Sequence, residues 1–349
     1  MITSRATNLP CMLVNPATAL LGLNSTAPCL YRNAVAIQQS SRRPFSSTIT
    51  RRIREFFPET ETRRIKETPP AWPHPIYTEE ELKRVRVAHR ETRNLGDKVA
   101  LMTIRFLRFS LDLATGYKHD KAVALHQKDP AKAKQKYAMT EKKYLTRNIF
   151  LESIAGVPGM VGGMLRHLRS LRRMKRDGGW METLLEESYN ERMHLLTFLK
   201  MGEPGWFMRV MVLLAQGVFF NAFFIAYICS PSICHRFVGY LEEEAIITYT
   251  REIADLDAGR LPEWENLDAP EIAVKYWQMP EGHRKMRDLL MYVRADEAKH
   301  REVNHTFGNL DWKHDPNPYT SVYKDPERPY PKQGIQNLQQ TGWERDDVI

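Results

Sequence analysis

The spacing of apolar and polar positions along the chain predicts helices. Apolar residues recur three and four residues apart, and short stretches rich in glycine and proline interrupt the pattern. Four segments follow this periodicity, covering about residues 144–169, 180–201, 232–256 and 281–307. The first contains five glycines and prolines, which suit close helix packing and a bend. We therefore expect an all-α fold built on a bundle of four helices.

Two further predicted helices have unusually wide apolar surfaces. One begins near Asp97, and its apolar face is edged by Arg105 and Arg108. That pattern suits a helix lying in a membrane interface, and it suits an ordinary buried helix equally well. The other, Val210–Ile228, has nineteen residues without a charge, enough to cross a bilayer. Because a crossing would separate the bundle helices before and after it, we expect a second helix that lies on the membrane.

Acidic residues and histidines recur in order on the four bundle segments. Glu191 and His194 lie three residues apart, and so do Glu297 and His300. On a helix, this spacing projects both members of a pair from one side. Glu152 is the single charge in an apolar run, where an acid is costly unless it is paired or bound to a metal.

The third bundle segment adds one more acid that faces inward. Of three consecutive glutamates, Glu242 shares a helical stripe with Ala245, Ile246 and Tyr249. The order Glu, Glu-x-x-His, Glu, Glu-x-x-His is that of ferritin-like di-iron carboxylate four-helix bundles. A charged seam between helices is the other explanation, but it would leave these acids without basic partners. We predict two bound iron ions, because carboxylates and imidazoles with open positions suit iron that changes its oxidation state. Their predicted ligands are Glu152, Glu191, His194, Glu242, Glu297 and His300.

The residues around these ligands form four short motifs. They are Leu151-Glu152-Ser153, Asn190-Glu191-Arg192-Met193-His194, Leu241-Glu242-Glu243-Glu244-Ala245 and Arg294-Ala295-Asp296-Glu297-Ala298-Lys299-His300. With these motifs the chain resembles the alternative oxidases, which are mitochondrial di-iron ubiquinol oxidases that cyanide does not inhibit. The resemblance extends from about Lys98 to Leu310, without a departure at any ligand position. It implies a monotopic, homodimeric enzyme on the matrix face of the inner membrane that oxidises ubiquinol, reduces O2 to water and pumps no protons.

The resemblance also implies roles for residues near the metal ions. Tyr249 looks like the redox-active tyrosine of the family. The positions that match the family's quinol pocket are Arg147, Leu151, Glu244, Ala245 and Thr248, and those that match its dimer contact are His167 and Gln216.

Two polar residues directly precede the ligand pairs. Because Asn190 and Asp296 adjoin Glu191 and Glu297, we expect them to orient the histidines through hydrogen bonds. A third Glu-x-x-His, at 302–305, is rotated about 140° from Glu297 around the helix, and we reject it as a ligand pair.

The two ends of the chain differ from the bundle in composition. The first 54 residues contain seven arginines and no Lys, Asp or Glu, which is typical of a mitochondrial transit peptide. The sequence Arg43-Pro44-Phe45-Ser46 resembles a matrix-peptidase site cut after Phe45. We therefore expect a transit peptide over 1–45, an extended arm over 46–96, the oxidase domain over 97–310 and a Pro-rich, poorly ordered tail over 311–349.

Charge and cysteine content narrow the classes of protein. The net charge is +9, but the basic residues fall into separate groups, so no nucleic-acid partner is expected. Four cysteines form no Cys-x-x-Cys and no disulfide framework, and none matches the regulatory cysteine of plant alternative oxidases. The chain is therefore more similar to fungal members. Two alternatives remain: a plastid-type plastoquinol oxidase, and a non-catalytic inner-membrane protein that crosses at residues 149–165 and 210–228.

Overall fold

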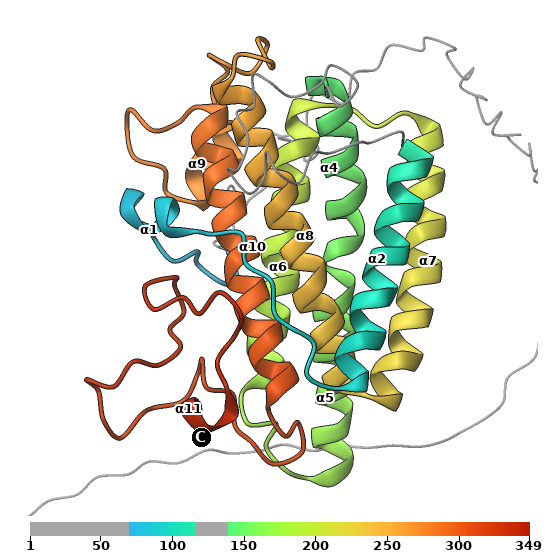
Figure 1. Ribbon diagram of the computed structural model, residues 1–349, viewed down its shortest axis with the longest axis vertical. Coiled ribbons are helices and arrows are strands. Elements are labelled where there is room, and N and C mark those ends of the chain that lie inside the picture. The colour runs from blue at the N-terminus through green and yellow to red at the C-terminus, as the bar shows by residue number, and fades with distance from the viewer. Residues whose placement is uncertain (1–69, 116–138) are drawn as a thin grey trace, which may run out of the picture. The chain divides into compact units, whose positions relative to one another are not determined.

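The computed structural model describes residues 70–115 and 139–349, and within these ranges the regular structure is helical (Figure 1). A single isolated bridge, between Asp268 and Lys285, is the β-type pairing found there. The helices are α1 (Glu79–Arg84), α2 (Leu95–Thr115), α4 (Glu141–Ala155), α5 (Val157–Arg173), α6 (Trp180–Met201), α7 (Trp206–Cys229), α8 (Pro231–Asp257), α9 (Glu271–Tyr276), α10 (Met286–Asn309) and α11 (Arg345–Val348). The expected transit peptide, its cleavage site and residues 46–69 of the arm lie outside the described residues.

The predicted four-helix bundle is confirmed. Helices α8 and α10 pack along each other, and α4 and α5 pack against α6. Together α4 and α5 correspond to the first predicted bundle helix, which is interrupted at Gly156. The interruption brings the chain close to α6, since the Ser188 hydroxyl donates to the Gly156 carbonyl at 2.8 Å. A Cβ at Gly159 would overlap the Leu184 backbone carbonyl, so the expected close packing depends on this glycine.

Helices α2 and α7 lie along one flank of the bundle (Figure 1). Phe237 of α8 packs against the apolar clusters that join α8 to α2 and to α7. The opposite faces of both helices stay uncovered by the rest of the described chain. On α2, for example, Met102 is 70% exposed and Phe106 is 67% exposed, and on α7 Val218 is 72% exposed. Among the described residues, helix α2 is therefore not an ordinary buried helix.

Within residues 70–115 and 139–349, two stretches are long and apolar enough to cross a membrane, judged by length and composition alone. They are Glu141–Arg173, which contains the break at Gly156, and Trp206–Cys229. In the first, 44% of the most apolar window is buried in the protein, whereas in the second only 11% is buried. The first thus contributes to the core on one side, and the second is a surface element.

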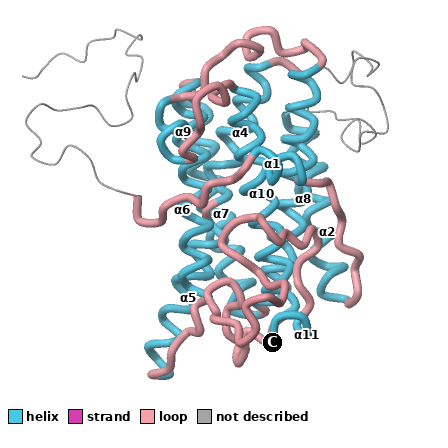
Figure 2. The backbone as a smooth tube through the Cα atoms, turned by 90° about the vertical axis from the view of Figure 1, so that its left-hand side faces the viewer, coloured by secondary structure: helices cyan, strands magenta, loops and turns pink. Residues whose placement is uncertain are grey.

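The C-terminal segment is more ordered than its sequence predicts. Residues 311–349 pack against α10 and end in α11, and Ile335, Trp343 and Val348 are buried (Figure 2). The Trp343 backbone N–H donates to the Thr306 hydroxyl on α10 at 2.9 Å. The expectation of a poorly ordered tail was therefore wrong, because single large apolar anchors hold the segment in place without a helical period.

Candidate metal centre

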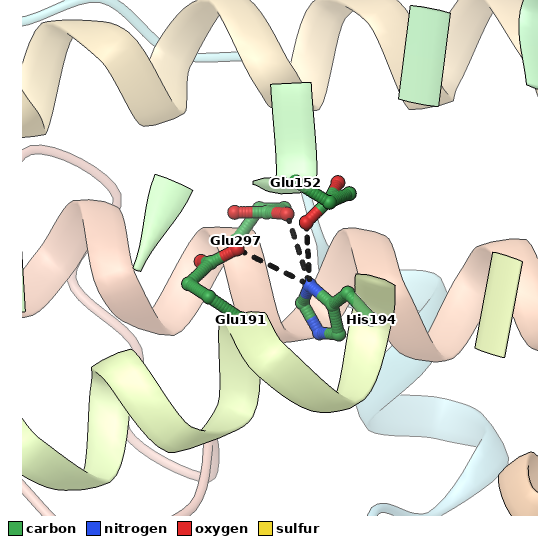
Figure 3. A group of neighbouring side chains, drawn as sticks. All are labelled: Glu152, Glu191, His194 and Glu297. Atoms are coloured by element: carbon green, nitrogen blue, oxygen red, sulfur yellow. Dashed lines mark ion pairs between the residues drawn. The ribbon is translucent and has the colours of Figure 1, made fainter. Parts of the chain in front are cut away.

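The six predicted metal ligands converge in the interior of the bundle. Glu152 comes from α4, Glu191 and His194 come from α6, and Glu297 comes from α10; these four face one another in Figure 3. Glu242 on α8 and His300 on α10 complete the set. None of the six is more than 6% exposed. The carboxylates and imidazoles therefore meet in a buried site.

Two overlapping ligand groups make up the cluster. One consists of Glu152, Glu191, His194 and Glu297, and the other consists of Glu191, Glu242, Glu297 and His300. Within each group, the potential ligand atoms lie within 4.8 Å of one another. Both groups contain Glu191 and Glu297. If the cluster held two metal ions, these two carboxylates would be available to both, while the other four residues would each belong to one group.

The ring nitrogens of both histidines point at the carboxylates. His194 Nδ1 lies 3.4 Å from Glu152 Oε2 and 3.4 Å from Glu297 Oε1. His300 Nδ1 lies 2.7 Å from Glu191 Oε1. Both nitrogens, Glu152 Oε2 and both oxygens of Glu191 are buried without a well-directed hydrogen bond. Buried polar atoms that face one common space in this way are what metal ions would satisfy.

The electrostatics of the cluster also call for cations. Burial and the nearby Glu191 carboxylate raise the pKa of Glu152 to about 8. Burial and Glu297 raise the pKa of Glu242 well above its ordinary value. These acids would therefore hold protons at neutral pH unless cations stood beside them. Two divalent ions would balance the charge of the four carboxylates, so the residues present fit a di-iron centre.

Asp296 holds His194 in the orientation that a metal ligand needs. Its Oδ2 accepts hydrogen bonds from His194 Nε2 at 3.1 Å, from Asn190 Nδ2 at 2.9 Å and from Trp277 Nε1 at 2.8 Å. With the proton on Nε2, the Nδ1 lone pair faces the carboxylates. Asn190 reaches the histidine only through Asp296, and it also donates to the Tyr276 hydroxyl at 3.0 Å.

Sequence reasoning missed three partners of Asp296. Its Oδ1 accepts from His74 Nε2 at 2.7 Å and from the Tyr77 hydroxyl at 2.8 Å, while Trp277 follows directly after α9. His74 and Tyr77 belong to the arm, and Trp277 lies between the third and fourth predicted bundle helices. No periodicity marks such residues, because each contributes one side chain from irregular backbone.

Tyr249 is hydrogen-bonded directly to a predicted metal ligand. Its hydroxyl donates to Glu152 Oε1, and its ring stacks on Phe198 with centroids 6.4 Å apart. The residue is 3% exposed. Burial, the Glu152 charge and the bond to Glu152 raise the pKa of Tyr249 well above its ordinary value, so the phenol keeps its proton at neutral pH.

The residues matched to a quinol pocket lie where α4 and α8 meet α2. Arg147 Nη2 pairs with Asp112 Oδ1 at 3.0 Å, and Arg108 Nη1 pairs with Glu244 Oε2 at 2.7 Å. Arg108 also contacts Asp112 at 3.0 Å, so one chain of ion pairs links the three helices. Thr248 is buried and donates to the Glu244 carbonyl at 2.9 Å.

The other matched positions are more exposed. Leu151 and Ala245 are half-buried, and His167 on α5 is exposed. Gln216 on α7 is exposed as well, and its amide donates to the Ser153 carbonyl of the same chain at 2.7 Å.

The rejected third pair stays outside the metal cluster. His305 Nε2 lies 2.9 Å from Glu243 Oε1, and Glu243 Oε2 lies 2.6 Å from His89. A different buried acid, Glu187, had not been predicted to be near the cluster. It precedes Glu191 by one helical turn, and Asn304 Nδ2 donates to its two oxygens at 3.0 and 2.9 Å. Burial raises the pKa of Glu187 to about 7. The four-residue spacing from Glu191 was a signal that could have identified it.

Comparison with known proteins agrees with this geometry. The family model described as "Alternative oxidase" matches residues 77–309. Over 307 residues the chain is 66% identical to the mitochondrial alternative oxidase of Venturia inaequalis, covering 88% of this chain and 85% of that protein. It is 63% identical over 312 residues to the one from Aspergillus niger, covering 89% of this chain and 87% of that protein. The mitochondrial alternative oxidase of Emericella nidulans is 61% identical over 331 residues, which cover 95% of this chain and 91% of that protein.

Proposed function

The chain belongs to the alternative oxidase family, and we propose that it oxidises ubiquinol and reduces O2 to water at a pair of iron ions. The observation that carries this proposal is the pair of ligand groups that share Glu191 and Glu297. Two metal ions held by common carboxylates can act together on one small molecule. Reduction of O2 needs such cooperation, because four electrons must reach a single molecule.

Besides the two shared carboxylates, each of the two ions would have its own pair of ligands. Glu152 and His194 would complete one set, and Glu242 and His300 would complete the other. Bound iron supplies reversible one-electron steps and coordination positions that remain open to oxygen. The Asp296 carboxylate keeps the proton of His194 on Nε2 and so keeps Nδ1 available as a ligand.

Tyr249 is the residue we propose to take part in the chemistry itself. Its hydroxyl donates to Glu152 Oε1, so it adjoins the centre without being a ligand. Bound iron would supply two electrons, and breaking the O–O bond would need a further electron and proton. We expect the Tyr249 phenol to give these up and to regain them from quinol. The stacked Phe198 ring fixes the orientation of the tyrosine.

We propose that quinol enters from the flank formed by α2 and α7. The apolar faces of these helices suit a lipid surface, which would make the protein monotopic on the matrix side of the mitochondrial inner membrane. Arg147 would hydrogen-bond a quinol oxygen, beside Leu151, Ala245 and Thr248. The ion pair between Arg147 and Asp112 supports this role, because it fixes the guanidinium at the junction of α4 and α2. A homodimer formed around His167 and Gln216 remains part of the proposal.

Iron analysis of the purified protein tests the proposal. We expect two irons per chain, and we expect Glu297→Ala and His194→Ala to lose them because a bridge or a terminal ligand is gone. Ubiquinol-dependent oxygen consumption that persists in cyanide is the matching activity. The control is Glu243→Gln, which changes a neighbouring buried acid that belongs to neither ligand group. One zinc per chain, or full quinol oxidation without metal, would refute the di-iron assignment.

A further inference from the structure

A polar cavity reaches the metal cluster from the side of α6 and α10. Its volume is about 380 Å³, and its walls come from the arm before α1, from α6 and α10, and from the segment after α10. The buried residues Asn190, Asp296 and His300 line its inner end. Exposed residues also line it, among them Glu182 and Gln333, so the cavity leads from the surface to a metal ligand.

The walls of this cavity suit water. Three carboxylates of α6, Glu182, Glu186 and Glu187, line it together with Lys299 of α10. Glu187 is buried, and Asn304 satisfies only part of its hydrogen-bonding capacity. A cavity of this size with several polar partners has room for a number of ordered water molecules.

The cavity and the apolar flank adjoin different helices. Helices α2 and α7 pack on α8, and α7 also packs on α4 and α5, whereas the cavity lies between α6, α10, the arm and the C-terminal segment. The arm and the loops after α10 lie on the side that faces the viewer in Figure 2. The polar cavity and the apolar flank therefore lie on different parts of the protein.

The proposed reaction makes a product that needs a polar route. Two quinols give four electrons and four protons, and one O2 takes up four of each to form two molecules of water. Protons released where quinol is oxidised and water formed at the centre both have to pass between the buried site and solvent. Apolar side chains on α2 and α7 would oppose the passage of protons and water, whereas a water-filled cavity would allow it.

We propose that this cavity is the aqueous route of the metal centre. Product water leaves through it, and protons exchange with solvent along the water that fills it. The inference rests on the proposed oxidase function, but the hydration of the cavity can be measured without turnover.

Two valines on α10 provide a matched test of hydration. Val303 lines the cavity and is 3% exposed, whereas Val293 lies on the same helix, is fully buried and does not line it. Val303→Cys and Val293→Cys would each be treated, in the iron-loaded full chain, with the trimethylammonium-ethyl methanethiosulfonate cation. Labelling is mapped by peptide mass spectrometry, so the native cysteines do not interfere. We expect Val303→Cys to be labelled at least about tenfold faster, because water and a cation reach that site.

A second stage asks whether the wet cavity carries the product. Each variant, labelled and unlabelled, is assayed for iron content and for oxygen consumption. We expect labelling of Val303→Cys to keep the iron and to slow turnover by about tenfold or more, because release of product water becomes limiting. Thr183→Cys, on the α6 wall, is the second variant should Val303→Cys fold poorly.

The possible outcomes distinguish a failure of the proposed aqueous route from a failure of the proposed oxidase function. Equal labelling of the two valine variants would overturn the proposal, and so would a label that leaves turnover unchanged or that slows it only by releasing iron. An unlabelled chain that holds two irons yet consumes no oxygen would instead refute the oxidase function, whatever the labelling shows.

Discussion

At the scale of single residues, the ring of Tyr249 packs in the core, whereas its hydroxyl is the group expected to take part in the reaction. Tyr249→Phe keeps the ring stacked on Phe198 and removes only the bond to Glu152. We expect the free energy of unfolding to change by no more than about 1 kcal/mol, the value of one hydrogen bond. Oxygen consumption should fall by orders of magnitude, with iron content and quinol binding intact, because the phenol no longer supplies an electron and a proton. Near-normal turnover would make Tyr249 an ordinary core residue, and loss of iron would make it structural.

His235 gives a pH dependence that is separate from the metal ligands. Its Nε2 accepts from the Tyr227 hydroxyl and its Nδ1 donates to Asn304 Oδ1, each at 3.0 Å, so the ring is held neutral. Burial lowers its pKa to about 4. The unfolded chain, with an ordinary pKa near 6.5, therefore binds more protons, and stability is lost as the pH falls from about 6.5 to about 4.

The loss should amount to roughly 3 kcal/mol over that range for this one histidine. Thermal unfolding measured between pH 7.5 and pH 5 is the test, with His235→Gln for comparison. The variant keeps one donor and one acceptor but does not titrate, so its midpoint should fall less steeply than that of the wild type. Parallel curves for the two proteins would contradict the prediction.

The convergence of the acids and histidines could be predicted from sequence, and their hydrogen-bond partners could be predicted only in part. Glu191 and His194 repeat a helical spacing, and that spacing fixes their direction whatever else the chain does. Asp296 was identified because it adjoins a ligand on the same helix. Its partners His74 and Trp277 come from irregular backbone, where no period tells which way a side chain points.

At the scale of helices, two glycines inside helices should respond in opposite ways to the same substitution, because their surroundings differ. Gly159 lies in α5 against the Leu184 carbonyl, whereas Gly217 lies in α7 with no atom within 4 Å of an added Cβ. Gly217→Ala should stabilise the protein by up to about 1 kcal/mol through helix propensity. Gly159→Ala should destabilise it by about 1–3 kcal/mol, because a backbone carbonyl cannot give way as a side chain can.

Chemical unfolding in a mild detergent measures both changes. Equal effects of the two substitutions would show that the α5–α6 contact is looser than the structure has it. A loss of iron with Gly159→Ala would be consistent with the prediction, because Glu191 lies on the helix that α5 contacts.

The bounds of individual helices could be predicted from sequence better than the burial of their faces could. The second bundle helix was expected over 180–201, and α6 is Trp180–Met201, with glycines on either side of it. The same reasoning could not choose between a buried and an interfacial α2, because both need an apolar face. That choice depends on which helices pack nearby, as do the buried positions of Trp343 and Ile335 in the C-terminal segment.

At the scale of the whole molecule, the question is whether the chain crosses the membrane. Helix α7 runs beside the bundle, and its two ends join directly to α6 and α8. If α7 crossed the membrane, α6 and α8 beside it would also have to lie within the bilayer. The buried acids on these two helices would then lie in the bilayer core. Charged groups in a bilayer core are costly, and the polar C-terminal segment covers one side of this bundle. A protein resting on one surface by α2 and α7 avoids that cost.

Protease protection decides between the two arrangements. We expect protease added outside intact mitoplasts to leave both the Lys118–Lys143 connection and the segment after Leu310 uncut, because both would lie on the matrix side. Lysis with detergent is the control, since Val322 in the C-terminal segment is 97% exposed and should then be reached. Cleavage of either segment in intact mitoplasts would favour a spanning protein. Protection of both before lysis and cleavage after it would place both segments on the matrix side, as expected for a protein that rests on that face of the membrane by α2 and α7.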